Sequence, residues 1–99
     1  MIVPCGSLAE VRANIDRLDR IIVPLLAERA GYVRQAGQLK PSRDAVVDHP
    51  RIEDIIVKVR ALAGEQEIDP DLIERIYRAM IDAYIAFEDG VWTRAHAAP

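Results

Sequence analysis

Four charged side chains stand where apolar residues are expected, and these are the residues in the sequence that could do chemistry. Arg29 falls on the apolar seam of the N-terminal helical segment, and Arg12 and Lys40 flank that seam at equivalent heptad positions. Glu88 interrupts the apolar stripe of the C-terminal segment. An unpaired charge is costly to bury. These four residues therefore need partners, either within the protein or in a ligand.

Two interpretations of these charges are open. In the structural one, Arg29 pairs with Glu88 or with Asp19 and fixes the register of packed helices. In the functional one, the cations are considered together: they outnumber the single carboxylate and leave a surplus of positive charge. A small anion, best a dicarboxylate, would satisfy that surplus, because the planar guanidinium group pairs with carboxylates through two hydrogen bonds.

A long N-terminal helix must position the three cations. Ser7 and Glu10 form a capping box, in which the Ser7 hydroxyl bonds the amide of Glu10 and the Glu10 carboxylate bonds the amide of Ser7. Apolar residues then recur at helical spacing, as Leu8, Val11, Ile15, Leu18, Ile22 and Leu25. The pattern continues to about Leu39 and predicts a helix about 48 Å long.

Pro24 lies inside this predicted helix and should bend it. The alternative is two helices broken near Pro24, but the apolar phase passes through the proline without a shift, which favours one kinked helix. A helix of this length cannot be covered by 99 residues folded alone. The sequence therefore predicts a second chain beside it.

Two further helices follow. Lys40–Asp44 is the predicted break, and Asp48 is the predicted cap of the second helix, with Pro50 in its first turn and Gly64 at its end. Asp69 caps the third, with Pro70 at its first position, and this helix reaches about Arg94. No strand-like alternation is present. We predict an all-α protein with a single domain over residues 1–99 and a core at about 7–94.

Composition narrows the function. The net charge is −3, with 13 basic and 16 acidic residues, so no basic surplus indicates a nucleic-acid partner. Cys5 is the only cysteine, and the two histidines lack paired ligand spacing, so we expect no disulfide and no metal. No glycine-rich cofactor loop, membrane span or signal segment is evident. We expect a cytoplasmic protein that needs no cofactor and has no membrane partner.

The segment Leu8–Asp19, followed by Leu25–Arg29 and by Lys40 eleven residues later, resembles the all-helical chorismate mutases. The bacterial isochorismate-pyruvate lyases built on the same fold share this pattern, and the resemblance covers about residues 7–94. It implies an intertwined homodimer with two equivalent sites that take residues from all three helices. It also implies a pericyclic reaction without a cofactor.

The resemblance assigns roles to individual residues. Arg12 matches an arginine donated across the dimer interface, and Arg29 matches one that binds a substrate carboxylate. Lys40 contacts the ether oxygen and a carboxylate, and Glu88 donates a hydrogen bond to the ether oxygen. The predicted catalytic residues are thus Lys40, Glu88 and Arg29. The predicted substrate-binding set contains these three residues and Arg12, together with Asp48, Arg51, Ile52 and Tyr84. The Tyr84 ring also suits a core or interface position.

The residue at position 52, an isoleucine, bears on which substrate the protein uses. Many chorismate mutases have a glutamate there, if one gap is allowed after Lys40, whereas the lyases tend to be apolar. The spacing from Lys40 to Arg51 also agrees with the lyases, but the Asp48–Arg51 pair and the segment 84–88 favour the mutases. We expect chorismate mutase activity, with isochorismate-pyruvate lyase activity as the alternative. A helical dimer without catalysis is the third interpretation.

Overall fold

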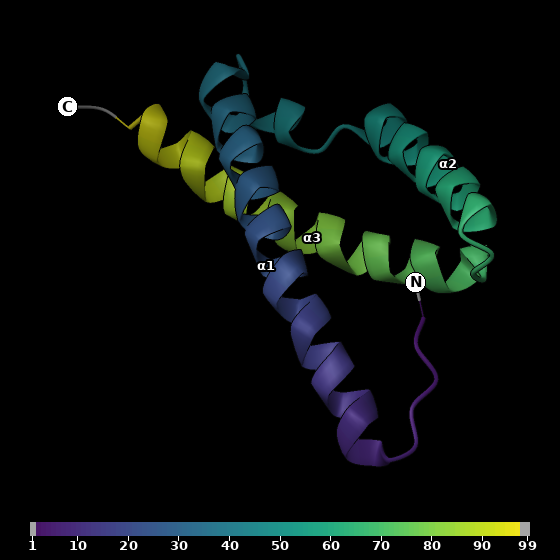
Figure 1. The fold of residues 1–99 in the computed structure, drawn as a ribbon. Helices are drawn as coiled ribbons and strands as arrows, with labels where there is room; N and C mark the ends of the chain where they lie inside the picture. Colours follow the sequence, from purple (N-terminus) through teal and green to yellow (C-terminus); the bar gives the residue numbers. More distant parts are fainter. Residues whose placement is uncertain (1, 98–99) are drawn as a thin grey trace. The chain divides into compact units, whose positions relative to one another are not determined.

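The computed structural model describes residues 2–97, and all regular structure within them is helical (Figure 1). The elements are α1 (Leu8–Leu39), the short 3₁₀ helix η1 (Arg43–Val46), α2 (His49–Glu65) and α3 (Pro70–Ala95). The predicted all-α class is therefore confirmed. The chain divides into two compact units, residues 1–32 and 33–99, and each is described by itself. The single domain over 1–99 stays a prediction, and Met1 and residues 98–99 lie outside the described part.

The first unit holds most of α1 and its N-terminal cap. The Glu10 amide donates to Ser7 Oγ at 3.2 Å, which confirms half of the predicted capping box. The other half is wrong by one residue, because Glu10 Oε2 accepts from the amide of Gly6 at 2.9 Å. α1 continues through Pro24 without interruption, so the alternative of two broken helices is also wrong.

The apolar stripe of this part of α1 is open to solvent. Leu8 is 60% exposed and Leu25 is 59% exposed, although both lie on the predicted buried seam. Its other members are exposed as well: Val11, Ile15, Leu18 and Ile22. A continuous apolar face of this kind usually marks an interaction site in a soluble protein. A second chain, as predicted from the sequence, could pack against this exposed face.

The second unit contains a helical hairpin of α2 and α3. Both helices begin as predicted: Asp48 accepts from the amide of Arg51 at 3.0 Å, and Asp69 accepts from the amide of Asp71 at 2.9 Å. The core of the unit is small and apolar, and its buried residues are Val46, Ile56, Val59, Ala63, Ile81 and Val91. The capped starts fix which faces of α2 and α3 meet in this core.

The turn between α2 and α3 differs from the prediction. Gly64 does not end α2, which continues to Glu65. The residue with a left-handed backbone is Glu67, at φ 57°, and its amide donates to the Gly64 carbonyl at 3.1 Å. Gly64 was a misleading helix-end signal, because the left-handed residue lies after the end of α2 and is Glu67 rather than a glycine.

An ion-pair network joins α2 to α3 along their length. Arg78 bonds Glu53 of α2 at 3.1 Å and Glu74 of its own helix at 2.7 Å. Arg60 of α2 bonds both Glu74 and Asp71, each at 2.9 Å. The two arginines hold the pKa of Glu74 below its usual range, and the hydrogen bond from Arg78 is the largest cause. These contacts fix the register of the hairpin that carries the C-terminal half of the candidate site.

The predicted break after α1 contains η1, which the sequence did not reveal. The Ala45 amide donates to the Ser42 carbonyl at 3.2 Å, and Val46 is buried. Arg43 makes a two-point ion pair with Asp89 of α3, at 2.7 and 2.9 Å. The segment between α1 and α2 is therefore fastened to α3 rather than being an open loop.

Candidate active site

Two of the predicted catalytic residues meet in the second unit. Lys40 follows the last residue of α1, and its Nζ forms an ion pair with Oε2 of Glu88 in α3. Glu88 is the only charged residue that is buried among those described, with 7% of its surface exposed. The structural interpretation of the sequence offered Arg29 as a partner of Glu88 or of Asp19, and it did not name Lys40, which the structure places against Glu88. The negative charge of Glu88 on the apolar stripe is thus neutralised by Lys40, at the end of α1.

Gly37 explains how the end of α1 comes so close to α3. A Cβ atom on Gly37 would lie 3.1 Å from Glu88 Cγ, 3.2 Å from the Glu88 carbonyl oxygen and 3.2 Å from Val91 Cγ1. These distances are tighter than ordinary van der Waals contact, so a side chain at this position would force the helices apart. Sequence reasoning missed this role, because a glycine inside a helix signals only weakness until its neighbours are known.

Trp92 holds the backbone of Lys40. Its indole Nε1 donates to the Lys40 carbonyl at 3.0 Å. Trp92 lies one turn after Glu88 on α3, so the two side chains lie on the same helix face. Its ring stacks on His96, with centroids 4.4 Å apart. No sequence signal pointed to this bond.

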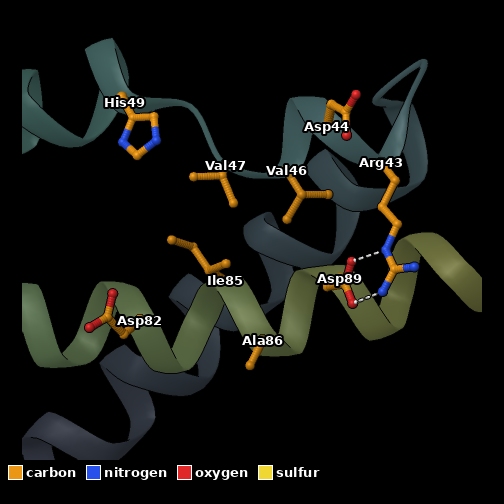
Figure 2. A pocket seen from close by; sticks show the side chains of 9 residues that line it. All are labelled: Arg43, Asp44, Val46, Val47, His49, Asp82, Ile85, Ala86 and Asp89. Atoms are coloured by element: carbon orange, nitrogen blue, oxygen red, sulfur yellow. Dashed lines mark hydrogen bonds and ion pairs between the residues drawn. The ribbon is translucent and has the colours of Figure 1, made fainter.

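A pocket of about 740 Å³ lies between the segment 43–49 and α3. Figure 2 shows its apolar residues, Val46, Val47 and Ile85, between charged groups at both ends. Asp44, Asp82 and Asp89 line it with Arg43, whose hydrogen bond lowers the pKa of Asp89. Three carboxylates against one guanidinium make it a poor site for a dicarboxylate. Its lining includes none of the predicted site residues.

The remaining predicted residues of the second unit lie on α2 and α3. The Asp48 carboxylate caps α2, and the Arg51 guanidinium pairs with Asp54 at 2.8 Å. Ile52 is half-buried, and Tyr84 is half-buried one turn before Glu88. The structure therefore joins Asp48 to Arg51 through the helix cap. It gives their side chains structural contacts rather than a shared anion site.

Arg12 and Arg29 lie in the first unit, on α1. Arg12 is exposed and Arg29 is half-buried. Because the two units are described separately, the structure does not bring these arginines together with Lys40 and Glu88. Their assignment to the site rests on the sequence.

Residues 2–97 lack two features that would indicate other classes of function. No cluster of three or more histidine, cysteine, aspartate or glutamate side chains in that range is arranged to hold a metal ion. Within the same residues, no helix combines the length and the apolar character needed to cross a membrane.

Comparison with known proteins identifies the family of this helical chain. The family description "Chorismate mutase type II" matches residues 11–89, which is most of the chain. The chain therefore belongs to the chorismate mutase type II family, and the resemblance seen in the sequence is confirmed.

Three relatives show how the family varies. The chain is 31% identical to the isochorismate pyruvate lyase of Pseudomonas aeruginosa over 94 residues, which cover 95% of this chain and 93% of the lyase. It is 29% identical to the chorismate mutase of Methanocaldococcus jannaschii over 77 residues, covering 77% and 78% of the two chains. It is 32% identical to the T-protein of Haemophilus influenzae over 84% of this chain, but over only 22% of that protein. Both activities expected from the sequence thus occur among its relatives.

Proposed function

We propose that this protein converts chorismate to prephenate. The observation that carries the proposal is the Lys40–Glu88 ion pair in a chain of the chorismate mutase type II family. The reaction is a rearrangement within one molecule, so it needs neither a nucleophile nor a cofactor. In this proposal the enzyme works in the cytoplasm, in aromatic amino acid biosynthesis.

Lys40 is the proposed donor to the ether oxygen of the substrate. Negative charge develops on this oxygen as its bond to the ring breaks, and a fixed donor stabilises that charge. An ammonium group has three N–H donors, so contact with Glu88 leaves donors for a substrate. The Glu88 side chain is 9% exposed, so water competes little for its carboxylate, whereas the 25% exposed Lys40 side chain can be reached by a substrate.

Arg12 and Arg29 bind the two carboxylates of the substrate in this proposal, with Arg12 donated by the partner subunit. Their roles come from the family resemblance. Two guanidinium groups that hold both carboxylates would keep the flexible enolpyruvyl arm over the ring, which lowers the entropy cost of the reaction. Asp48, Arg51, Ile52 and Tyr84 are proposed to surround the ring.

The protein is proposed to act as a homodimer. The exposed apolar stripe of α1, from Leu8 to Leu25, supports this because a single chain leaves it in water. Sedimentation equilibrium should give a mass near twice that of the 11.1 kDa chain. Leu18→Asp places a charge on the stripe and should shift the protein towards monomer, whereas Lys58→Asp on the exposed face of α2 should not.

Isochorismate is the second candidate substrate, with salicylate and pyruvate as products. The 31% identity to the Pseudomonas lyase over nearly all of both chains favours it, as does the apolar Ile52. The same cations could act, because the carbon–oxygen bond also breaks in this reaction while a ring hydrogen moves to the departing enolpyruvyl group. This hydrogen completes the methyl group of pyruvate.

Parallel assays of the purified protein with chorismate and isochorismate decide between the two. We expect prephenate from chorismate, and Lys40→Ala should remove nearly all turnover while the helical circular dichroism spectrum is unchanged. Pyruvate from isochorismate without prephenate from chorismate would replace the first candidate by the second. If neither compound reacts and neither raises the melting temperature, the protein is a helical dimer without catalysis.

A further inference from the structure

Lys40 can act on a substrate only if its ammonium is held at a defined point, and its position in the chain does not ensure this. The residue follows the end of α1, where its amide still donates to the Ala36 carbonyl at 3.0 Å. Its own carbonyl lies beyond the helix, and Pro41 follows. A carbonyl at a helix end has no partner within the helix and must find one elsewhere.

We propose that Trp92 and Gly37 are positioning residues that together fix Lys40 opposite Glu88. This inference rests on the proposed function, because it concerns the residue that would act on the ether oxygen. Neither residue needs to touch the substrate. Each acts on the place where the end of α1 meets α3.

Trp92 supplies the partner that the Lys40 carbonyl needs. α3 holds Lys40 at two points one helical turn apart: Glu88 binds its side chain, and the Trp92 indole binds its backbone at 3.0 Å. Two such contacts define both the position and the direction of the lysine, whereas the ion pair alone would let its backbone turn. The indole is itself restrained, because it stacks on His96 with an angle of 15° between the ring planes.

Gly37 sets the separation at which both contacts can form. The three atoms nearest to a Cβ at this position belong to Glu88 and Val91, and one of them is a backbone oxygen that cannot rotate away. An added methyl group would therefore move the end of α1 by a few tenths of an ångström. That shift falls on Lys40, three residues further along the chain.

The first test is Trp92→Phe, which removes the N–H donor and keeps an aromatic ring. We expect kcat for the substrate that the wild-type protein turns over to fall about fivefold to tenfold, with KM changed less than twofold, because transition-state contacts depend on small displacements. Thr93→Val is the matched control. It removes a neighbouring hydrogen bond, from Thr93 Oγ1 to the Asp89 carbonyl at 2.8 Å, and should leave kcat unchanged.

A cycle with Lys40→Ala separates positioning from general stabilisation. If Trp92 acts through Lys40, Trp92→Phe will not lower the residual rate of the Lys40→Ala variant any further. If it merely stabilises the fold, the two losses will multiply. Multiplied losses, or an unchanged kcat in Trp92→Phe, would overturn the inference.

Gly37→Ala tests the second residue. We expect kcat to fall at least fivefold although alanine favours the helical backbone. Gly64→Ala makes the same change in α2, where nothing lies within 4 Å of an added Cβ, and should have no effect on kcat. Equal kcat values in the two alanine variants would show that the close approach at Gly37 does not position the site.

A spectroscopic measurement reads the geometry independently of turnover. Trp92 is the only tryptophan, so the protein gives a single indole N–H resonance. We expect it to exchange slowly with solvent and to lose that protection in Gly37→Ala but not in Gly64→Ala. A freely exchanging indole in the wild-type protein would overturn the positioning contact. A protected indole in a protein that turns over neither substrate would instead refute the proposed function.

Discussion

Replacing Lys40 by methionine should expose the cost of leaving Glu88 without its cation. Methionine keeps much of the length of the lysine side chain but carries no charge. The Glu88 side chain is only 9% exposed, so in the variant a carboxylate would be held away from water with its ion pair gone. The size of the change in the free energy of unfolding depends on how deeply this ion pair is buried.

Breaking a buried pair by removing one partner costs about 3–5 kcal/mol, whereas an exposed pair contributes about 0–1 kcal/mol. Lys40 is 25% exposed, so water can approach the vacated side of Glu88 and reduce the penalty. We therefore expect Lys40→Met to lower the free energy of unfolding by about 2–3 kcal/mol. For a chain of this size the melting temperature should fall by roughly 10–20 °C.

Urea unfolding followed by circular dichroism measures this difference, at a fixed protein concentration and with the slope against urea compared between variants. Lys58→Met is the control. Its lysine pairs with Asp54 at 2.8 Å, but the two side chains are 64% and 47% exposed, so the loss of stability should be much smaller than in Lys40→Met.

The double variant Lys40→Met/Glu88→Leu sharpens the test. It removes the stranded carboxylate and should return to within about 1 kcal/mol of the wild-type stability. Its turnover should stay abolished, which separates the role of the pair in folding from its proposed role in catalysis. If Lys40→Met costs no more than Lys58→Met, or if the double variant is as unstable as the single one, our account of the buried pair is wrong.

Two further predictions concern single residues. The pKa of Asp89 is lowered by Arg43, so this pair stabilises the fold above the unfolded pKa of about 3.9, and the contribution disappears as pH falls further. Asp89→Asn should therefore weaken the loss of stability between pH 5 and pH 3 in acid titrations, and an identical slope would count against the pair. Asp69→Ala removes the cap of α3 and should cost about 0.5–2 kcal/mol in urea unfolding, against no measurable change for the exposed Glu65→Ala.

The helices could be predicted because their signals are local. Asp48 and Asp69 cap their own helices, so four or five neighbouring residues contain all the information needed. The left-handed backbone at Glu67 escaped prediction because it depends on how the chain must reverse between two packed helices. The same limit applies to η1, whose buried Val46 is fixed by α3 and not by its neighbours in sequence.

Two members of the candidate site could be picked out from the sequence, but their pairing with each other could not. Charges on or beside apolar stripes singled out Lys40 and Glu88, but the partner of Glu88 depends on where the end of α1 meets α3. Gly37 and Trp92 decide that meeting point. Their types gave no hint of it, because a glycine in a helix and an aromatic residue near a chain end are each compatible with many roles.

The contacts of the second unit span very different lengths of chain, and this bears on the order in which they form. Arg60 and Glu74 are 14 residues apart, and Arg78 and Glu53 are 25 apart, so the α2–α3 hairpin closes short loops. Lys40 and Glu88 are separated by 48 residues, and Trp92 and Lys40 by 52. Since long loops cost more entropy to close, we expect the hairpin to form first and residues 33–47 to dock onto it afterwards.

The same segment should also open first in the native protein. Its release would break the bonds to Glu88, Asp89 and Trp92 while the hairpin core at Ile56 and Val59 stays closed, as a separate cooperative unit. In native-state hydrogen exchange the amides of Lys40 and Ala45 should then exchange at a lower free energy than those around Val59. A common free energy for both regions would show that the site and the hairpin open together. Catalytic competence would thus be set by a local equilibrium, and a variant could lose activity while most of its helices stay folded.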